Sequence, residues 1–159
     1  MSRGKQISKR RIMPDAKYQS ELLAKFVNTV MKGGKKTTAQ AIVYGMLDIL
    51  KEKKQENPLT FFEKAIDAIR PQLEVRSRRV GGANYQIPLP VSASRQNALA
   101  FRWVIEAAQA RKGHSMKEKL AQEFIDAMEG LGGAMKKKAD VHRMAEANKA
   151  FAHFARHLR

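Results

Sequence analysis

The sequence predicts a mainly α-helical protein: a bundle of about six helices with one protruding two-stranded β-hairpin and an extended basic N-terminal arm. Apolar residues recur every three or four positions in most of the chain, which is the spacing of amphipathic helices. Residues 73–91 instead alternate with a period of two around a pair of glycines. Residues 1–17 show no periodicity and few apolar side chains. We therefore expect an arm at 1–17 and a single helical domain at 18–159, with the hairpin inserted at about 73–91.

Length and composition agree with one globular domain. A chain of 159 residues with 43% apolar residues can bury a core of its own. No apolar run approaches the roughly 18 residues that would span a bilayer. The chain has no cysteine, which excludes a disulfide framework, a thiol nucleophile and a thiolate metal site. This composition fits a cytoplasmic protein.

The first two helices are bounded by glycine and by a capping pattern. Segment 21–34 places an apolar stripe on one helical face, and Gly33–Gly34 is expected to end that helix. Thr37 and Gln40 have the spacing of a capping box, so a second helix is expected to start there. The stripes consist of Leu22, Leu23, Phe26, Val27, Val30 and Met31, and of Ile42, Val43, Met46, Leu47 and Leu50.

The third helix has a signal at each end. Asn57 can cap its N-terminus, and Pro58 suits the first helical position because the missing N–H has no partner there anyway. Pro71 is expected to stop the helix. Its stripe is Phe62, Ala65, Ile66 and Ile69.

Three more helices follow the hairpin. Segment 94–113 is apolar on most sides, which is typical of a helix at the centre of a bundle. Its narrow polar strip consists of Arg95, Arg102, Glu106 and Gln109. Ser115 and Glu118 form a second capping box, for a helix that reaches Met128. One last helix is expected over residues 134–159.

The hairpin sequence makes a prediction about register. The apolar residues of both strands carry odd numbers: Leu73, Val75, Ile87, Leu89 and Val91. Matching them requires odd residues to face odd residues, and hence an odd-length turn or a one-residue bulge near Gly81–Gly82. Arg76 and Arg78 would then turn outward. Pro88 and Pro90 lack an N–H on one edge, so pairing should use the other edge.

Charge points to a polyanionic partner. The chain carries 31 Lys and Arg against 15 Asp and Glu, a net charge of +16. Arg76, Arg78 and Arg79 cluster on the hairpin, where their planar forks can grip phosphate. Lys35 and Lys36 precede a helix N-terminus, which also suits a phosphate. The basic arm residues are Arg3, Lys5, Lys9, Arg10 and Arg11.

The sequence offers no catalytic or metal-binding constellation. "GGKKT" at 33–37 lacks the first glycine of a phosphate-binding loop and follows a helix rather than a strand. The histidines have no carboxylate or cysteine partners at ligand spacing; they are His114, His142, His153 and His157. We therefore expect no enzyme activity, no cofactor and no metal. The run "KKK" at 136–138 is as consistent with a solvated helix face as with a binding site.

Folded RNA is a better candidate than DNA for the partner. Of the aromatic residues, only Tyr85 lies in the basic hairpin, so no platform for stacking bases is expected. The others, such as Phe26, Phe62, Trp103 and Phe124, lie in apolar stripes and are expected in the core. No helix carries Asn, Gln or Arg at base-reading spacing. An architectural DNA-binding protein remains the alternative.

Five segments resemble a known family in order along the chain. They are "KYQSELLAKFVNTVMKGGKKTTAQAIVYGMLD", "NPLTFFEKAIDAIRPQLEVRSRRVGGANYQIPLPV", "RQNALAFRWVIEAA", "SMKEKLAQEFIDA" and "KKKADVHRMAEANKAFAHF". The pieces "EVRSRRVGGANYQIP" and "HRMAEANKAFAHF" are the most specific. Together they resemble the family of bacterial-type small-subunit ribosomal protein seven over nearly the whole chain from about residue 10. Ala83–Asn84 departs from the threonine that is common after the glycines.

The resemblance implies a function and a set of partners. Members of this family are helical with a protruding β-ribbon, bind the 3′ major (head) domain of small-subunit rRNA, and nucleate assembly of the head. It further implies a cytoplasmic place in the ribosome, near exit-site tRNA, mRNA and neighbouring head and platform proteins. The residues expected to face tRNA or mRNA are Gly81, Gly82, Tyr85 and Arg143. Those expected to bind rRNA are the five arm residues, Lys35, Lys36, Arg76, Arg78, Arg79, Arg95, Arg102 and Arg111.

Overall fold

The computed structural model describes residues 12–54, 57–80 and 82–157. Most of the predicted arm lies outside these ranges, including its five basic candidates, Arg3, Lys5, Lys9, Arg10 and Arg11. The chain divides into two compact units, one that ends at Gln40 and one that starts at Ala41, and each is described by itself. The division into an arm at 1–17 and a domain at 18–159 stays a prediction.

The first unit contains α1, Glu21–Val30. The Ser20 hydroxyl caps this helix by accepting a hydrogen bond from the Leu23 N–H at 3.3 Å. Leu23, Phe26 and Val27 form its buried face, in agreement with the predicted stripe. Before the helix, the backbone N–H of Lys17 donates to buried Asp15 at 3.1 Å, so the described end of the predicted arm forms a turn.

α2, Lys36–Lys54, begins one residue before the predicted cap. The carbonyl of Lys35 accepts a hydrogen bond from the Ala39 N–H at 3.2 Å, so Lys35 occupies the position before the helix and Thr37 lies within the first turn. The prediction of a Thr37 cap was therefore wrong. The loop before it turns through Gly33 and Gly34, whose φ angles of 59° and 74° lie in the left-handed region.

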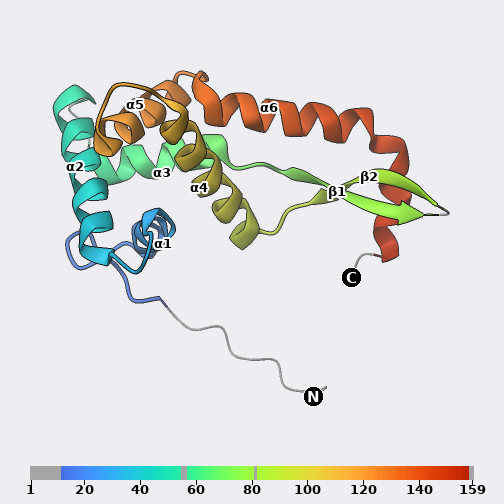
Figure 1. Ribbon diagram of the computed structural model, residues 1–159, viewed down its shortest axis with the longest axis horizontal. Coiled ribbons are helices and arrows are strands. Elements are labelled where there is room, and N and C mark those ends of the chain that lie inside the picture. The colour runs from blue at the N-terminus through green and yellow to red at the C-terminus, as the bar shows by residue number, and fades with distance from the viewer. Residues whose placement is uncertain (1–11, 55–56, 81, 158–159) are drawn as a thin grey trace, which may run out of the picture. The chain divides into compact units, whose positions relative to one another are not determined.

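The second unit contains four further α-helices in its described residues (Figure 1). They are α3 (Pro58–Ile69), α4 (Ala93–Ala110), α5 (Met116–Met128) and α6 (Gly132–Ala147). Asn57 caps α3 as predicted, accepting from the Leu59 N–H at 3.0 Å. α4 packs against the other three, as each of them also does, so its predicted central position stays a prediction.

Aromatic side chains form part of the core, as the sequence indicates. The rings of Phe62 and Phe124 meet edge to face with centroids 5.3 Å apart. Trp103 of α4 is also buried, and so is Phe26 of the first unit. Within the part of the chain that the structure describes, no helix is both long and apolar enough to cross a membrane.

The predicted last helix is two elements. α6 ends at Ala147, and a 3₁₀ helix, η1 (Lys149–His157), follows. Between them Asn148 has φ −101° and ψ 14°, and its side-chain amide donates to the carbonyl of Met144 at 2.8 Å. This bond occupies a carbonyl at the helix end, and beyond Asn148 the chain continues as η1, which lies against the hairpin.

The hairpin consists of β1 (Leu73–Val80) and β2 (Ala83–Pro90), paired antiparallel. Arg76 faces Ile87 and Val80 faces Ala83, so odd residues face even ones and the predicted odd-to-odd register was wrong. Only residues 81–82 connect the strands, and this two-residue turn, with Gly82 at φ 91°, sets the register.

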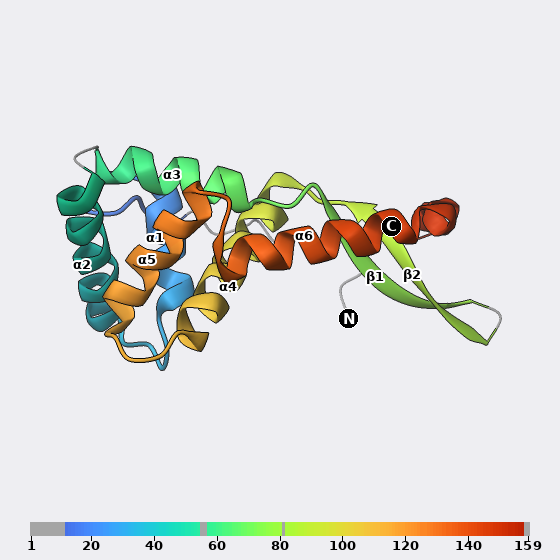
Figure 2. The ribbon, with the colours of Figure 1, turned by 90° about the horizontal axis from the view of Figure 1, so that it is seen from above.

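The burial of residues on both faces of the hairpin explains why pairing apolar residues of β1 with apolar residues of β2 predicted the wrong register. Ile87 and Pro88 are neighbours in β2 and therefore point to opposite faces, and yet both are buried. Both faces of the hairpin root are covered, so the root has no single apolar face to align. Figure 2 shows the hairpin extending away from α3, α4 and α5, with α6 beside it.

The prolines lie where the ladder does not need their N–H groups. The N–H of Val91 donates to the carbonyl of Gln72 at 3.1 Å, next to the pair formed by Leu73 and Pro90. Bonded and non-bonded pairs alternate in an antiparallel ladder, so Pro90 and Pro88 both occupy non-bonded positions. Pairing therefore uses the edge opposite to the prolines, as predicted.

Candidate nucleic-acid interface

Two of the predicted rRNA-binding arginines bind the same carboxylate at the root of the hairpin. Glu74 of β1 is 9% exposed. Its Oε1 accepts from Arg76 Nε at 2.7 Å, and its Oε2 accepts from Arg95 Nε at 3.1 Å. Arg76 belongs to β1 and Arg95 to the first turn of α4, and both side chains remain about half exposed. The sequence predicts both arginines as rRNA-binding residues, but it does not indicate that Glu74 brings them together.

The cationic surface continues along α4 and β1. Arg102 is exposed and follows Arg95 by seven residues, which places both on one face of the helix. In β1, Arg79 is exposed and Arg78 is partly exposed. Because they are adjacent in a strand, Arg78 and Arg79 point to opposite faces of the hairpin, so the hairpin presents positive charge on both.

The first unit has its own cationic turn between α1 and α2. Lys32, Lys35 and Lys36 are all exposed there. The two intervening glycines carry no side chains, and a Cβ at either position would meet nothing within 4 Å. The turn is therefore an open, positively charged loop at the start of a helix, where an anion is favoured.

Arg111, by contrast, forms ion pairs with acidic side chains within the protein. Its guanidinium contacts Glu123 at 2.5 Å and also bonds Asp126. Burial by itself would lower the pKa of Arg111, but hydrogen bonds and charge from Asp126 and Glu123 outweigh it and raise that pKa. Glu123 is buried, and its other oxygen accepts from the Ala134 N–H at 2.9 Å. This network ties the end of α4 to α5 and α6, and an rRNA contact by Arg111 stays a prediction.

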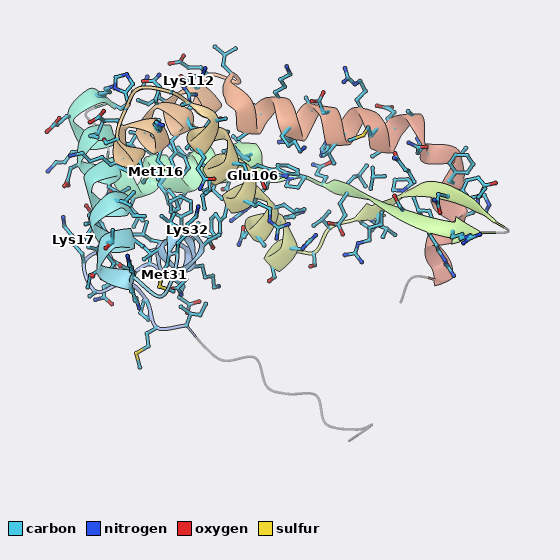
Figure 3. All side chains as sticks on the ribbon, in the orientation of Figure 1. Lys17, Met31, Lys32, Glu106, Lys112 and Met116 are labelled. Atoms are coloured by element: carbon cyan, nitrogen blue, oxygen red, sulfur yellow. The ribbon has the colours of Figure 1, made fainter. Side chains whose placement is uncertain are left out.

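A basic depression beside Arg111 was missed by sequence analysis. It has a volume of about 600 Å³ and is lined by Lys53, Lys112 and Lys119, together with Arg111, His114, Glu118 and Gln122. Figure 3 shows Lys112 on the loop that joins α4 to α5. The signal in the sequence was weak because these lysines are separated along the chain, and segment 113–131 as a whole is acidic.

On α6, the lysines of the "KKK" run differ from one another. Lys136 and Lys137 are exposed. Lys138 instead donates to the carbonyl of Ala68 at 2.5 Å, and burial lowers its pKa. One turn later, His142 Nε2 accepts from the Gln72 N–H at 3.2 Å. Lys138 thus attaches α6 to the end of α3, and His142 attaches it to the segment that links α3 to β1.

The residues predicted to face tRNA or mRNA lie on two elements. Gly82 and Tyr85 belong to the hairpin, whereas Gly81 is outside the described residues. The Tyr85 ring packs against Phe151 of η1, so one of its sides is occupied. Arg143 is 81% exposed on α6 and contacts Asp140 at 2.8 Å.

Comparison with known proteins assigns the chain to a family. Residues 2–149 match the family described as ribosomal protein S7p/S5e. The chain belongs to the ribosomal protein S7p/S5e family. It is 54% identical to the small ribosomal subunit protein uS7 of Colwellia psychrerythraea, 56% to that of Azotobacter vinelandii and 57% to that of Alcanivorax borkumensis. Each match covers 97% of this chain and 99% of the relative.

Membership of the ribosomal protein S7p/S5e family confirms the resemblance seen in the sequence. The family consists of structural ribosomal proteins rather than enzymes. Among the residues the structure describes, no three His, Asp or Glu side chains gather in a way that could hold a metal ion. What the described surface offers is a set of exposed Arg and Lys side chains on a hairpin, helices and loops, which suits the phosphates of a large folded RNA.

Proposed function

We propose that this protein binds the 3′ major domain of small-subunit rRNA directly and nucleates assembly of the head of the subunit. As a member of the ribosomal protein S7p/S5e family, it is a structural protein of the small ribosomal subunit in the cytoplasm. The observation that carries the proposal is the meeting of Arg76 and Arg95 at the hairpin root, where β1 and α4 present exposed guanidiniums together.

The remaining contacts follow from exposure. Arg102 continues the surface along α4, and Arg78 and Arg79 extend it over both faces of the hairpin. Lys35 and Lys36 offer a separate phosphate site at the start of α2. The arm residues Arg3, Lys5, Lys9, Arg10 and Arg11 complete the proposed rRNA-binding set.

Lys112 and Lys119 join the proposed set because they line the basic depression. The participation of Arg111 is less favoured, since its donors are directed at Glu123 and Asp126.

The finer partners are tRNA and mRNA. We propose that the hairpin end, with Gly81, Gly82 and Tyr85, lies beside exit-site tRNA and the emerging mRNA, and that Arg143 faces the same ligands. Support comes from packing, because α6 runs beside the hairpin and brings the element that carries Arg143 to it. Neighbouring head and platform ribosomal proteins would contact other parts of the surface.

Binding is proposed to work through counterion release and shape. Each phosphate that a Lys or Arg neutralises frees a condensed counterion, so affinity falls steeply with salt. If about eight phosphates are neutralised, affinity should fall as roughly the sixth power of the salt concentration. Cations on several separate elements would hold distant RNA helices in one arrangement, which is what nucleation of the head requires.

Filter binding to a transcript of the head domain tests this function. The full chain should bind with a steep salt dependence and should be competed by head-domain RNA far better than by duplex DNA. A chain without residues 1–17 and without the hairpin should bind much more weakly, and a footprint with and without 1–17 would locate the arm. Equal binding by the shortened chain, a salt slope near zero, or preference for duplex DNA would contradict the proposal. The last result would favour the architectural DNA-binding alternative, which no present observation supports.

A further inference from the structure

We propose that Glu74 is a positioning residue for RNA binding: its buried carboxylate holds Arg76 and Arg95 side by side so that they grip one backbone phosphate together. This inference rests on the proposed RNA-binding function and deepens it. It assigns a role in binding RNA to an acid, and it names the chemical group that the arginine pair would take, a phosphodiester oxygen pair.

The geometry shows one arginine on each oxygen of the carboxylate. Oε1 of Glu74 accepts from Nε of Arg76 at 2.7 Å and forms an ion pair with its Nη2 at 2.6 Å. Oε2 accepts from Nε of Arg95 at 3.1 Å. Arg76 comes from the hairpin and Arg95 from α4, so the carboxylate joins two elements that are separate in sequence. The two guanidiniums are therefore held on the two oxygens of a single carboxylate.

The arginines keep donors for a ligand. A guanidinium carries five N–H groups. The hydrogen bonds to Glu74 use the Nε–H of each arginine, and Nη2 of Arg76 is in ion-pair contact with the same carboxylate. The side chains remain 53% and 42% exposed, whereas that of Glu74 is only 12% exposed. The acid is thus largely hidden behind the arginines, and a phosphate that approaches from solvent meets the guanidiniums.

Charge explains why an acid can favour binding of a polyanion. Two arginines without a counter-charge would repel each other and spread into different rotamers. Glu74 reduces the charge of the trio to one positive unit, which still attracts one phosphate. It also fixes both side chains before binding, so less rotamer entropy is lost when the phosphate arrives. The gain in affinity is largest for a folded RNA that already holds a phosphate at the position of the two guanidiniums.

One substitution at Glu74 should affect two RNAs differently. Glu74→Gln removes a negative charge and weakens the grip on the arginines. Binding to the head-domain transcript should weaken roughly tenfold, the effect of losing one charge-assisted hydrogen bond, and the salt exponent should fall by about one. Binding to poly(U) of equal length should be unchanged or tighter, because that RNA responds to net charge alone. Glu63→Gln, which makes the same charge change at an exposed site on α3, should weaken neither.

Arg95→Lys provides a second variant, at an exposed position. Lysine keeps the charge but lacks the planar fork, so this variant should also weaken binding to the head-domain transcript and spare poly(U). In a Glu74→Gln background it should have little further effect, because the pair has already been released. Thermal melting of each variant would show that the fold is retained.

Three results would overturn the inference. Tighter binding of the head-domain transcript by Glu74→Gln would mean that the acid only opposes RNA. Equal weakening for both RNAs, together with a lower melting temperature, would mean that it only stabilises the hairpin root. An Arg95→Lys variant with unchanged affinity would remove the paired grip. Failure of the proposed function would look different: the wild-type chain would then not distinguish the head-domain transcript from poly(U), whatever happens at Glu74.

Discussion

The ring of Tyr85 in β2 lies against the ring of Phe151 in η1, with centroids 5.0 Å apart and planes inclined at 57°. This contact joins the hairpin to the last described element of the chain. The contact between the rings stabilises η1 against the hairpin, where the chain no longer follows the axis of α6 after Asn148. The stability of this segment should therefore depend on the hairpin.

Phe151→Ala should loosen η1 without unfolding the rest of the second unit. An aromatic pair of this kind contributes about 1 kcal/mol beyond its buried area, and 3₁₀ helices have little stability of their own. Hydrogen exchange should show lost protection in residues 149–153 and unchanged protection in α4 and α5. Lys149→Ala, at an exposed position in the same element, serves as the control and should change protection little. Unchanged exchange in the Phe151 variant would contradict the role given to the ring pair.

Glu123→Ala should destabilise the fold strongly. Glu123 is 1% exposed and accepts from both Arg111 and the Ala134 N–H, so its removal leaves the buried Ala134 N–H without its acceptor and Arg111 with only one of its two acids, Asp126. The expected loss is about 3 kcal/mol in the free energy of unfolding, measured with urea. Asp140→Ala breaks an exposed pair with Arg143 and should cost less than about 0.5 kcal/mol. Similar losses in the two variants would show that burial of the Glu123 pair is energetically unimportant.

Gly132→Ala should cost more than Gly130→Ala, although both glycines have positive φ angles, 91° and 76°. A Cβ at Gly132 would lie 2.8 Å from Oε1 of Glu123, whereas a Cβ at Gly130 would meet nothing within 4 Å. We expect about 1 kcal/mol for the backbone strain at Gly130 and a further 1–3 kcal/mol for the clash at Gly132. Urea unfolding of both variants measures the difference, and equal costs would refute the clash.

The contact of His142 with Gln72 should make stability depend on pH. Burial, followed by the positive charge of Lys138, lowers the pKa of His142 below its ordinary value of 6.5. The imidazole of His142 therefore binds a proton more readily in the unfolded chain than in the folded one. The stability that the neutral imidazole contributes to the fold is complete above about pH 6.5 and is lost as pH falls through the lower folded-state pKa.

His142→Gln keeps an acceptor for the Gln72 N–H but does not titrate, and it should flatten the fall in the free energy of unfolding between about pH 7 and 5. Lys138→Gln should move the pKa of His142 back toward its ordinary value, which an NMR titration of the imidazole would detect. A His142→Gln variant with the same acid sensitivity as the wild type would show that other groups cause it.

Local signals in the sequence were enough to predict most of the helices. Asn57 followed by Pro58 marked the start of α3, and the apolar stripes gave buried residues such as Phe62 and Phe124. Such signals depend on neighbouring residues only. They failed where a distant partner decides, as at Asn148, where the chain leaves α6 and η1 packs on β2.

For the candidate interface too, the sequence predicted some features and could not predict others. Net charge and the arginine cluster predicted a cationic surface on the hairpin and α4, and Arg76, Arg79, Arg95 and Arg102 are indeed exposed. The sequence could not separate these from Arg111, because an arginine bound to two acids in the fold has the same local pattern as one that faces solvent. Nor could it indicate that Glu74 lies beneath two arginines, since Arg95 is 21 residues away.

By itself, therefore, the sequence determined the helical class, the presence of a basic hairpin and the polyanionic nature of the partner, because period, glycine pairs and charge are properties of short segments or of the whole chain. Only the tertiary structure decided the hairpin register, the break after α6 and the partner of each arginine. These features depend on tertiary contacts between residues that are far apart in the sequence. The packing of the elements, rather than proximity along the chain, determines contacts such as that of Glu74 with Arg95.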